Sequence, residues 1–463
     1  MLVSVVRCKA PEQNFRKVNT SVPNSYAGVV LDTVNAVNLN WRVYFDDANL
    51  IALIDTALKN NQELNILLQE IEISKNEVKA RKGEYLPFVH LQTETGLEKE
   101  GRFTRHGAVD EALEIAPGTP FPEPLQQYGF GLSASWEVDI WRKLRNAKKA
   151  ALNRYLGSVE GRNFMVTNLV AEIAKLYYEL MALDNLLDII QQNIAIQTNA
   201  LRIVLQQKDA AKQTQLAVNR FEAQLLNTKN LQYEIQQRII ETENQIHFLT
   251  GSFPNEILRN SNQFLTLQVD SIPAGIPSQL LVNRPDIRQA EMELSAAQLD
   301  VQVARANFYP SLSIEAGIGQ GAFKPSYLLK PESMLYNLAG GLTAPLINRN
   351  AIRATYNTAN ARQMQEIYQY ERTVLTAYLE VMNELSRLQN YSNSFDTKAR
   401  EVEILTQSIM ISNNLFMSAR ADYLEILLTQ REALESKMEL IEIKKKQISA
   451  RIGIYKALGG GWR

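Results

Sequence analysis

The chain has 463 residues, with 49 Lys and Arg against 50 Asp and Glu and a formal net charge of -1, and this balance excludes a polybasic nucleic-acid surface as its main feature. A single cysteine excludes a disulfide framework, and three dispersed histidines argue against a Cys/His metal site. No apolar run approaches the roughly 18 residues that a membrane-spanning helix needs.

Two segments in the first part of the chain, at about residues 85–97 and 127–137, have the alternating pattern of β-strands. In such a pattern every second side chain lies on the same face. The second segment places glycine and serine on one face and large apolar side chains on the other. Those apolar residues are Tyr128, Phe130, Leu132 and Trp136. We therefore predict two strands joined by a proline-rich loop.

A tract without glycine or proline then runs from Arg162 to Thr250. Its apolar residues recur at steps of three and four, which indicates the seam of a long helix packed on another helix. They are Val166, Leu169, Ile173, Leu176, Leu180, Leu183, Leu187, Ile190 and Ile194. The seam breaks at residues 208–214, a polar stretch whose last residue, Thr214, can cap a new helix. We expect a helical hairpin with its tip near residue 211.

Two further alternating segments follow, at about residues 308–322 and 333–345. One face again carries mainly serine, glycine and other small or polar residues. The other face carries Leu312, Ile314 and Ile318 in the first segment and Tyr336, Leu338 and Leu342 in the second. These segments predict two more strands of the same kind.

A second tract free of glycine and proline runs from Leu346 up to Gly453. As one straight helix it would be on the order of 150 Å long, so a helix folded back on a second one is the better interpretation. Val374, Tyr378 and Val381 continue the seam spacing. The polar stretch 418–422 interrupts it, and we expect a second hairpin tip near residue 420.

The four predicted strands, each of about 10 to 14 residues, have the length of strands that cross an outer membrane at a tilt. A sheet packed on a soluble core fits the alternation equally well. The helical seams already face one another, however, which favours an apolar strand face against lipid around a watery lumen. Four strands cannot close a barrel, and open edges cannot lie in lipid, so a membrane sheet requires the chain to oligomerise.

The chain also contains an internal repeat. Adding 223 to a residue number maps Asn60 to Asn283, and adding 208 maps Tyr128 to Tyr336, because the first strand-to-strand loop is longer than its counterpart. Each half therefore predicts a helix, two strands and a helical hairpin. The expected parts are an N-terminal extended segment at 1–48, a first repeat at 49–250, a linker at 251–275, a second repeat at 276–457 and a C-terminal tail at 458–463.

Four stretches of the sequence resemble the TolC-like outer-membrane factor family, and within it the lipoprotein outer-membrane channels of RND-type efflux systems. They are the helix entry from Trp41 to Leu64, the junction Trp136–Trp141, the stretch Leu281–Glu291 with the following Tyr309–Leu312, and the end Tyr455–Trp462. The resemblance implies a mainly α-helical, internally duplicated protomer. Three copies of its four strands and four main helices would form a 12-stranded membrane β-barrel and a 12-helix periplasmic tunnel.

The resemblance also implies a passive homotrimeric duct without catalytic residues, cofactor or metal. It would dock on a periplasmic adaptor (membrane fusion) protein and an inner-membrane RND-type transporter, embedded in outer-membrane lipid. Family channels are closed at their periplasmic end by residues at the second hairpin tip, here Phe416, Arg420, Asp422, Tyr423 and Glu425. For Asp422 and Glu425, roles as a helix cap and a solvated charge fit the sequence equally well.

Lipoproteins of the family carry acyl chains on an N-terminal cysteine, and the resemblance assigns this role to Cys8. Two features depart from the family pattern. Arg7 replaces the small residue expected before that cysteine, and the segment Met1–Val6 is shorter than a signal h-region. A truncated or misassigned start would explain both departures, and we expect acylation of Cys8.

Other functions remain open at the level of sequence. A type I secretion duct would share the channel architecture, and a soluble periplasmic coiled-coil scaffold or adaptor would explain the helices but not the four alternating segments. An enzyme is the weakest alternative, because Glu137 and Asp139 lie at a strand-to-helix junction that favours capping over acid–base catalysis. The exported substrate is undetermined: drugs, metal ions, bile-type detergents and polypeptides all fit a duct.

Overall fold

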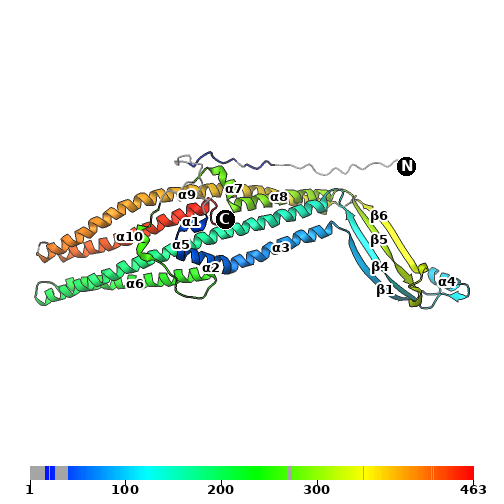
Figure 1. Ribbon diagram of the computed structural model, residues 1–463, viewed down its shortest axis with the longest axis horizontal. Coiled ribbons are helices and arrows are strands. Elements are labelled where there is room, and N and C mark those ends of the chain that lie inside the picture. Colours follow the sequence, from blue (N-terminus) through cyan, green and yellow to red (C-terminus); the bar gives the residue numbers. More distant parts are fainter. Residues whose placement is uncertain are drawn as a thin grey trace. The chain divides into compact units, whose positions relative to one another are not determined.

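The structure is a computed structural model that describes residues 16–19, 21–26, 40–269, 274–347, 349–418, 420 and 422–462. The chain, whose ribbon is coloured along the sequence in Figure 1, divides into two compact units. The first unit combines the chain up to Lys17 with Glu72–Leu156 and Met292–Tyr368. The second unit combines Val18–Ile71, Gly157–Glu291 and Gln369–Arg463.

The first unit is built around a four-stranded antiparallel sheet with the order β1-β4-β5-β6. Its strands are β1 (Phe88–Glu98), β4 (Leu125–Val138), β5 (Ser311–Ala322) and β6 (Met334–Thr343). The sheet confirms the prediction of four strands, two from each half of the chain. Every strand pairs without a register shift, because its alternating sequence contains no insertion that would require a bulge.

Helices lead into and out of this sheet. They are α3 (Gln62–Glu84) before β1, α5 (Lys143–Asp209) after β4, α8 (Pro285–Ala306) before β5 and α9 (Asn350–Met417) after β6. At the junction to α5, Asp139 accepts hydrogen bonds from the backbone N–H groups of Leu144 and Arg145, at 3.0 Å each. This contact satisfies the free N–H groups at the start of the helix.

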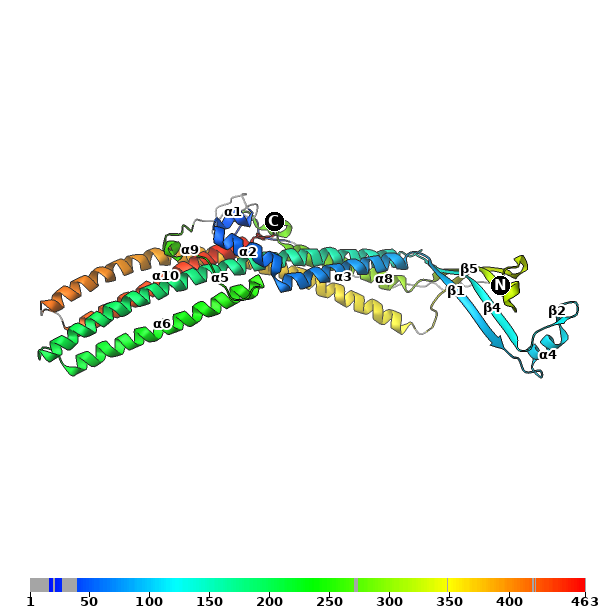
Figure 2. The ribbon, with the colours of Figure 1, turned by 60° about the horizontal axis from the view of Figure 1, so that its bottom comes forward.

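The longer strand-to-strand connection contains structure that the sequence did not predict. It includes α4 (Arg105–Ala112) and the short strands β2 (Glu114–Ala116) and β3 (Thr119–Pro120). Figure 2 shows α4 and β2 beyond the ends of β1 and β4. The Thr104 hydroxyl starts α4 by accepting a hydrogen bond from Gly107 N at 3.2 Å. The shorter connection contains two 3-10 turns, η4 (Pro325–Tyr327) and η5 (Pro331–Ser333).

Two long antiparallel hairpins dominate the second unit and confirm the expected long helices. The first joins α5 to α6 (Gln215–Thr250), and the second joins α9 to α10 (Tyr423–Ala457). The first connection turns at Ala211, whose φ is 55°. Thr214 and Asp422 cap the returning helices by accepting hydrogen bonds from Ala217 N and Tyr423 N.

The helices of the second unit lie side by side in the order α9, α10, α5, α6 (Figures 1 and 2). Ser436 of α10 donates to Glu401 of α9 at 2.7 Å, and Lys445 of α10 lies 3.3 Å from Glu179 of α5. Arg238 of α6 lies 3.4 Å from the same Glu179. Glu179 therefore links three of the four helices.

The largest core of the protein lies in this second unit. Tyr177 and Ile173 of α5 are fully buried there and pack with Ile441 of α10. The short helices α1 (Trp41–Phe45) and α2 (Ala48–Asn60) cover the same core. Among the helices of the described ranges, none is both long enough and apolar enough to span a membrane.

Two shorter helices precede α8 in the second half of the chain, namely η3 (Pro277–Gln279) and α7 (Leu280–Asn283). Between the repeats, the described part of the linker contains one 3-10 helix, η2 (Ser261–Thr266). Near the N-terminus, Tyr26 is buried and stacks on Tyr378 of α9 with ring centroids 5.7 Å apart. Through Phe264, η2 packs into the core of the second unit, and Tyr26 packs on α9.

Candidate functional site

The apolar residues predicted on the four strands share one face of the sheet. Cross-strand partners lie on the same face of an antiparallel sheet, and Leu132 is opposite both Leu91 and Ile318, while Ile318 is opposite Tyr336. The same register unites the whole predicted set: Tyr128, Phe130, Leu132, Trp136, Leu312, Ile314, Ile318, Tyr336, Leu338 and Leu342.

This face, which we call the apolar sheet face, is open in the protomer. Leu338 and Tyr336 are each 78% exposed, and Leu91 of β1 is 73% exposed. The register also places Val89, Leu91 and Leu97 of β1 on this face. The sequence analysis did not name these three residues among the lipid-facing ones. A largely exposed apolar surface of this kind is typical of a face that contacts a membrane or another protein.

The opposite face, the polar sheet face, is lined mainly by small, polar and acidic residues, and Phe88 and Leu335 are its exposed apolar exceptions. Its charged residues are Glu94, Glu98, Glu137 and Glu315, and the four strands contain no Lys or Arg. Gly131 and Gly319 bring β4 and β5 close together in the middle of this face. A Cβ atom on Gly131 would lie 2.7 Å from the Ile318 carbonyl oxygen, so only glycine fits there.

The carboxylates at the strand-to-helix junction have structural roles. Glu137 forms an ion pair with Lys143 at 2.5 Å, and Asp139 forms one with Arg145 at 3.0 Å in addition to its hydrogen bonds to the start of α5. Both groups are thus engaged within the junction. Their geometry is that of the capping and packing charges expected from the sequence.

The residues predicted for a periplasmic aperture lie together at the α9–α10 connection. Phe416 is in the last turn of α9, Arg420 is exposed in the connection, and Asp422 precedes α10. The Asp422 carboxylate accepts a hydrogen bond from Tyr423 N at 2.6 Å, and Glu425 is exposed in the first turn of α10. Acidic side chains here also interact favourably with the positive end of the helix dipole.

Tyr423 connects this tip to the first hairpin. It packs, together with Leu427, against a cluster of buried residues from both helices of that hairpin. The cluster comprises Val204, Ala217, Val218 and Phe221. Leu427 was not among the predicted aperture residues, although it follows Tyr423 by four residues and therefore shares its helix face. The tips of the two hairpins are thus at the same level.

Arg284, from the stretch that carries the family resemblance, is an almost fully buried cation. Its guanidinium donates to Asp286 in a two-point contact at 2.7 and 3.0 Å, to Glu380 of α9 at 2.7 Å and to the Ala457 carbonyl of α10 at 2.8 Å. Burial lowers the pKa of Arg284, but Asp286 and Glu380 outweigh it and the net shift is upward. Arg284 therefore joins three segments of the second unit as a permanent cation.

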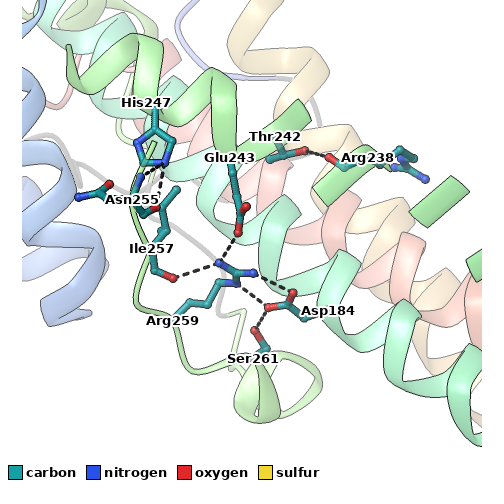
Figure 3. A network of polar contacts seen from close by, with 9 residues as sticks. All are labelled: Asp184, Arg238, Thr242, Glu243, His247, Asn255, Ile257, Arg259 and Ser261. Atoms are coloured by element: carbon teal, nitrogen blue, oxygen red, sulfur yellow. Dashed lines mark hydrogen bonds and ion pairs between the residues drawn. The ribbon is translucent and has the colours of Figure 1, made fainter. Parts of the chain in front are cut away.

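A second polar cluster holds the linker between the repeats on the first hairpin (Figure 3). Arg259 of the linker donates to both carboxylate oxygens of Asp184, at 2.6 and 3.0 Å, and to Glu243 at 2.9 Å. Ser261 donates to the same Asp184 at 2.5 Å, and His247 contacts the Asn255 backbone. Fork-shaped pairs of this kind fix orientation as well as distance.

The end of the linker is held from the other side by α10. Lys444 donates to the Leu267 carbonyl at 2.6 Å, and Arg451 donates to the Gln268 carbonyl at 3.0 Å. Burial lowers the pKa of Lys444. These contacts join residues far apart in the sequence and involve irregular backbone, so no local sequence pattern predicts them.

Among the described residues, no group of His, Cys, Asp and Glu could hold a metal ion. Cys8 lies outside the described residues.

Solved channels share this architecture. The protomer has a TM-score of 0.83 against a crystal structure of CusC, with 23% identity and coverage of 98% of this chain and 99% of that chain. The score is also 0.83 against the open state of the MtrE outer membrane channel of Neisseria gonorrhoeae, with 23% identity and 98% coverage of each chain. These similarities establish the fold.

Sequence comparison extends the similarity to curated proteins. The solvent efflux pump outer membrane protein SrpC of Pseudomonas putida is 26% identical over 90% of this chain and 87% of its own length. The cation efflux system protein CusC of Escherichia coli K12 is 25% identical over 97% of this chain and 95% of its own length. The model of the outer membrane efflux protein family matches residues 53–252 and 276–460. The chain therefore belongs to the outer membrane efflux protein family and is an efflux channel of the outer membrane rather than a soluble scaffold or adaptor.

Proposed function

We propose that three copies of this chain form a passive duct that crosses the outer membrane and continues through the periplasm. The observation that carries the proposal is the four-stranded sheet, which has one apolar face and two edge strands, β1 and β6, each paired on one side only within the described protomer. An open edge is not viable in lipid. Three sheets joined edge to edge give a closed barrel of 12 strands, within the range of known outer-membrane barrels.

In this assembly the apolar sheet face meets lipid and the polar sheet face lines the lumen. The ten predicted apolar residues would form the lipid-facing band, together with Val89, Leu91 and Leu97 of β1. The small residues of the polar sheet face leave the lumen open to water. A lumen lined mainly by small and polar side chains suits a duct, which transmits solutes without chemical conversion.

The assembly is tested by purifying the full chain from outer membranes in detergent. Light scattering should give the mass of three chains after subtraction of the micelle, and planar bilayers should show discrete ion conductance. A monomeric mass with no conductance would overturn the proposal. A soluble yield without detergent would contradict the assignment of the apolar sheet face to lipid.

We further propose that the α9–α10 connection forms the periplasmic aperture, with Phe416, Arg420, Asp422, Tyr423 and Glu425 around it. Three symmetry-related copies of the exposed Asp422 and Glu425 would make a ring of six carboxylates that attracts cations and repels anions. The contact of Tyr423 with the first hairpin would hold this ring in place.

The aperture is tested by single-channel recording of the double variant Asp422→Ala with Glu425→Ala. We expect a higher conductance and a weaker preference for cations than in the unmodified channel. The matched control is Glu435→Ala, which removes an exposed carboxylate from the same helix farther from the tip. If the double variant and the control have the same conductance and ion selectivity, Asp422 and Glu425 do not form the aperture.

The partners we propose are a periplasmic adaptor protein and an inner-membrane RND-type transporter, because the duct has no energy source of its own. The curated relatives are described as outer membrane proteins of solvent and cation efflux systems and of pyoverdine export. Their cargoes are chemically unrelated, so the transporter, not the duct, would select the substrate. Type I secretion is the alternative. Identifying which class of transporter co-purifies with the duct, an RND-type transporter or a type I secretion ATPase, distinguishes the two.

We also propose that Cys8 carries the acyl chains of a lipoprotein. The guanidinium of Arg16 lies 4.5 Å above the ring centre of Tyr368 in α9, which fixes the chain there. From Tyr368 back to the start of α9 at Asn350 is about 27 Å along the helix. The eight Cα-to-Cα steps from Cys8 to Arg16 can span about 28 Å, enough to reach the start of α9, the helix that follows β6. A free thiol in the intact mass of membrane-purified protein would refute acylation.

A further inference from the structure

A group of basic side chains lies where the sheet of the first unit passes into its helices. β1 and β4 contain no Lys or Arg, whereas the first two turns of α5 contain no acidic residue and four basic ones, namely Lys143, Arg145, Lys148 and Lys149. Cations near the N-terminus of a helix oppose its dipole. Lys143 and Arg145 are compensated by the ion pairs of the junction described above, but Lys148 and Lys149 form no ion pair within the described ranges.

Contacts at the junction place this group on the side of the apolar sheet face. Trp136 of that face donates its indole N–H to the Tyr85 carbonyl oxygen at 3.1 Å. The Arg145 guanidinium lies 5.9 Å from the centre of the Tyr85 ring. Lys148 and Lys149 follow Arg145 by three and four residues, so they are its neighbours on the helix surface. The basic group therefore continues the apolar sheet face beyond the end of β4.

Helix α3 brings another lysine to the same level. α3 and α5 lie side by side and run in opposite directions (Figures 1 and 2). Their register is fixed by Tyr85 against Arg145 and, ten residues away, by Lys75, which interacts electrostatically with Tyr155. Lys82 is therefore level with Lys148 and Lys149 of α5, is exposed, and forms no ion pair with any described residue. We call Lys82, Lys148 and Lys149 the junction lysines.

The second half of the chain shows that the fold of such a junction does not require lysines on the helix that leaves the sheet. Phe308, which corresponds to Tyr85 in the internal repeat, is also covered by a guanidinium, 5.1 Å from its ring centre. The two lysines of α5 are replaced there by Tyr356 and Asn357, and Tyr356 is buried against Phe308. A cation over an aromatic ring is thus common to both junctions. Three like charges that the fold does not need indicate an anionic partner outside the protomer.

The depth of the basic group matches a layer of lipid headgroups. When the apolar sheet face lies in the hydrocarbon region, the headgroup layer on each side of that region is about 5–8 Å thick. Arg145 and Lys149 lie about 3 and 9 Å along α5 from its start. Helical side chains lean toward the N-terminus, which in α5 faces the sheet, so the lysines reach back toward this layer. Trp136 and Tyr85 are of the residue types that favour the same interface.

We propose that Arg145 and the junction lysines bind the phosphate group of an anionic phospholipid in the periplasmic leaflet of the outer membrane, with its acyl chains on the apolar sheet face near Trp136. This inference rests on the proposed lipid-facing sheet and adds a headgroup site to it. Nε and Nη2 of Arg145 donate to Asp139, which leaves Nη1 for the phosphate. The flexible lysines add positive charge around it.

The test is native mass spectrometry of the detergent-purified full chain, titrated with phosphatidylglycerol or with phosphatidylcholine, which has no net charge. We expect the unmodified trimer to bind phosphatidylglycerol more tightly. The triple variant Lys82→Gln, Lys148→Gln and Lys149→Gln should bind phosphatidylglycerol about tenfold or more weakly, because each basic residue near an anionic lipid contributes about fivefold. Arg145 is retained in the variant, because it also holds the Asp139 cap of α5.

The matched control removes three exposed lysines near the first hairpin tip. Lys208→Gln, Lys212→Gln and Lys229→Gln change the net charge of the protein by the same amount. Lys208 is about 90 Å along α5 from Lys148, so this variant should bind phosphatidylglycerol as the unmodified protein does. Excess inorganic phosphate should not displace the lipid, because it has no acyl chains to contact the sheet. Displacement would show a site for free phosphate and overturn the lipid assignment.

Two results separate the headgroup site from the duct. If the protein is trimeric and conducts ions, but binds both lipids equally or keeps its preference in the triple variant, the headgroup site is wrong and the duct stands. If the protein neither inserts into vesicles of phosphatidylglycerol and phosphatidylcholine nor conducts ions, the lipid-facing sheet and the headgroup site are both wrong.

Discussion

Replacing Leu132 with arginine is a direct test of which sheet face meets lipid. Leu132 is in the middle of β4, between Leu91 and Ile318 on the apolar sheet face, and is 49% exposed in the protomer. An arginine on the lipid side of a barrel near the membrane midplane costs about 2–4 kcal/mol. With three copies, the trimer would lose about 6–12 kcal/mol of folding free energy in the membrane.

The neighbouring residue supplies the matched control. Ser133 is opposite His90 and Gly317 on the polar sheet face, so Ser133→Arg places the same charge in the watery lumen, one position along the same strand. The assay is the yield of heat-resistant trimer in outer membranes and the denaturant midpoint of the purified protein. We expect loss of trimer for Leu132→Arg and near-normal trimer for Ser133→Arg. An equal or larger loss for Ser133→Arg would refute the face assignment.

Three further predictions concern stability. Gly131→Val should abolish assembly, because a Cβ atom at this position would lie 2.7 Å from the Ile318 carbonyl oxygen. Gly340→Ala should assemble normally, because the atom nearest to its Cβ would be 3.9 Å away, and the trimer yields of the two variants test this difference. Arg284→Met should lower the free energy of unfolding by about 3–5 kcal/mol in a denaturant titration, because two carboxylates lose their buried partner, and a change below about 1 kcal/mol would contradict this. Burial raises the pKa of Tyr455 to about 12, so its stabilising effect is complete below pH 10 and is lost between pH 10 and 12. Tyr455→Phe should flatten the alkaline fall in stability, and an unchanged slope would exclude Tyr455 as its source.

The sheet could be predicted from the sequence because its information is local. Alternation in β4 and β5 places Leu132 and Ile318 on the apolar face of their own strands, and an antiparallel register can only join like faces. The partner of each residue did not follow from alternation. The pairing of β4 with β5, which come from different halves of the chain, is specified by long-range contacts alone.

The polar clusters of the second unit could not be predicted for a related reason. Arg259 and Asp184 are 75 residues apart, and Lys444 binds a backbone carbonyl 177 residues away. Their partners lie in or against an irregular linker that has no hydrophobic period to reveal its position. The contact of Tyr423 with the first hairpin tip is similar, since it depends on the two hairpins having matched lengths. Only Arg284 was indicated in advance, through the family resemblance of its motif.

The internal repeat has produced two hairpins of nearly equal length with different chemistry at their seams. The α5–α6 seam is apolar, with Leu176 and Leu180 packed on Ile246. The α9–α10 seam includes buried apolar residues such as Val381 and Leu388 far from its tip, whereas nearer the tip it is held by polar contacts, namely Ser436 to Glu401 and Lys398 to Glu439, at 2.7 Å each.

This difference has an energetic consequence. Burying one large apolar side chain stabilises a protein by about 1.5–3 kcal/mol, whereas an exposed ion pair contributes about 0–1 kcal/mol. Near its tip, the second hairpin is therefore the more weakly held of the two. An aperture that must open at a hairpin tip requires helices that shift against one another at low cost. The polar contacts near the tip of α9 and α10 meet that requirement, and the apolar seam of α5 and α6 provides the rigid frame against which these helices would move.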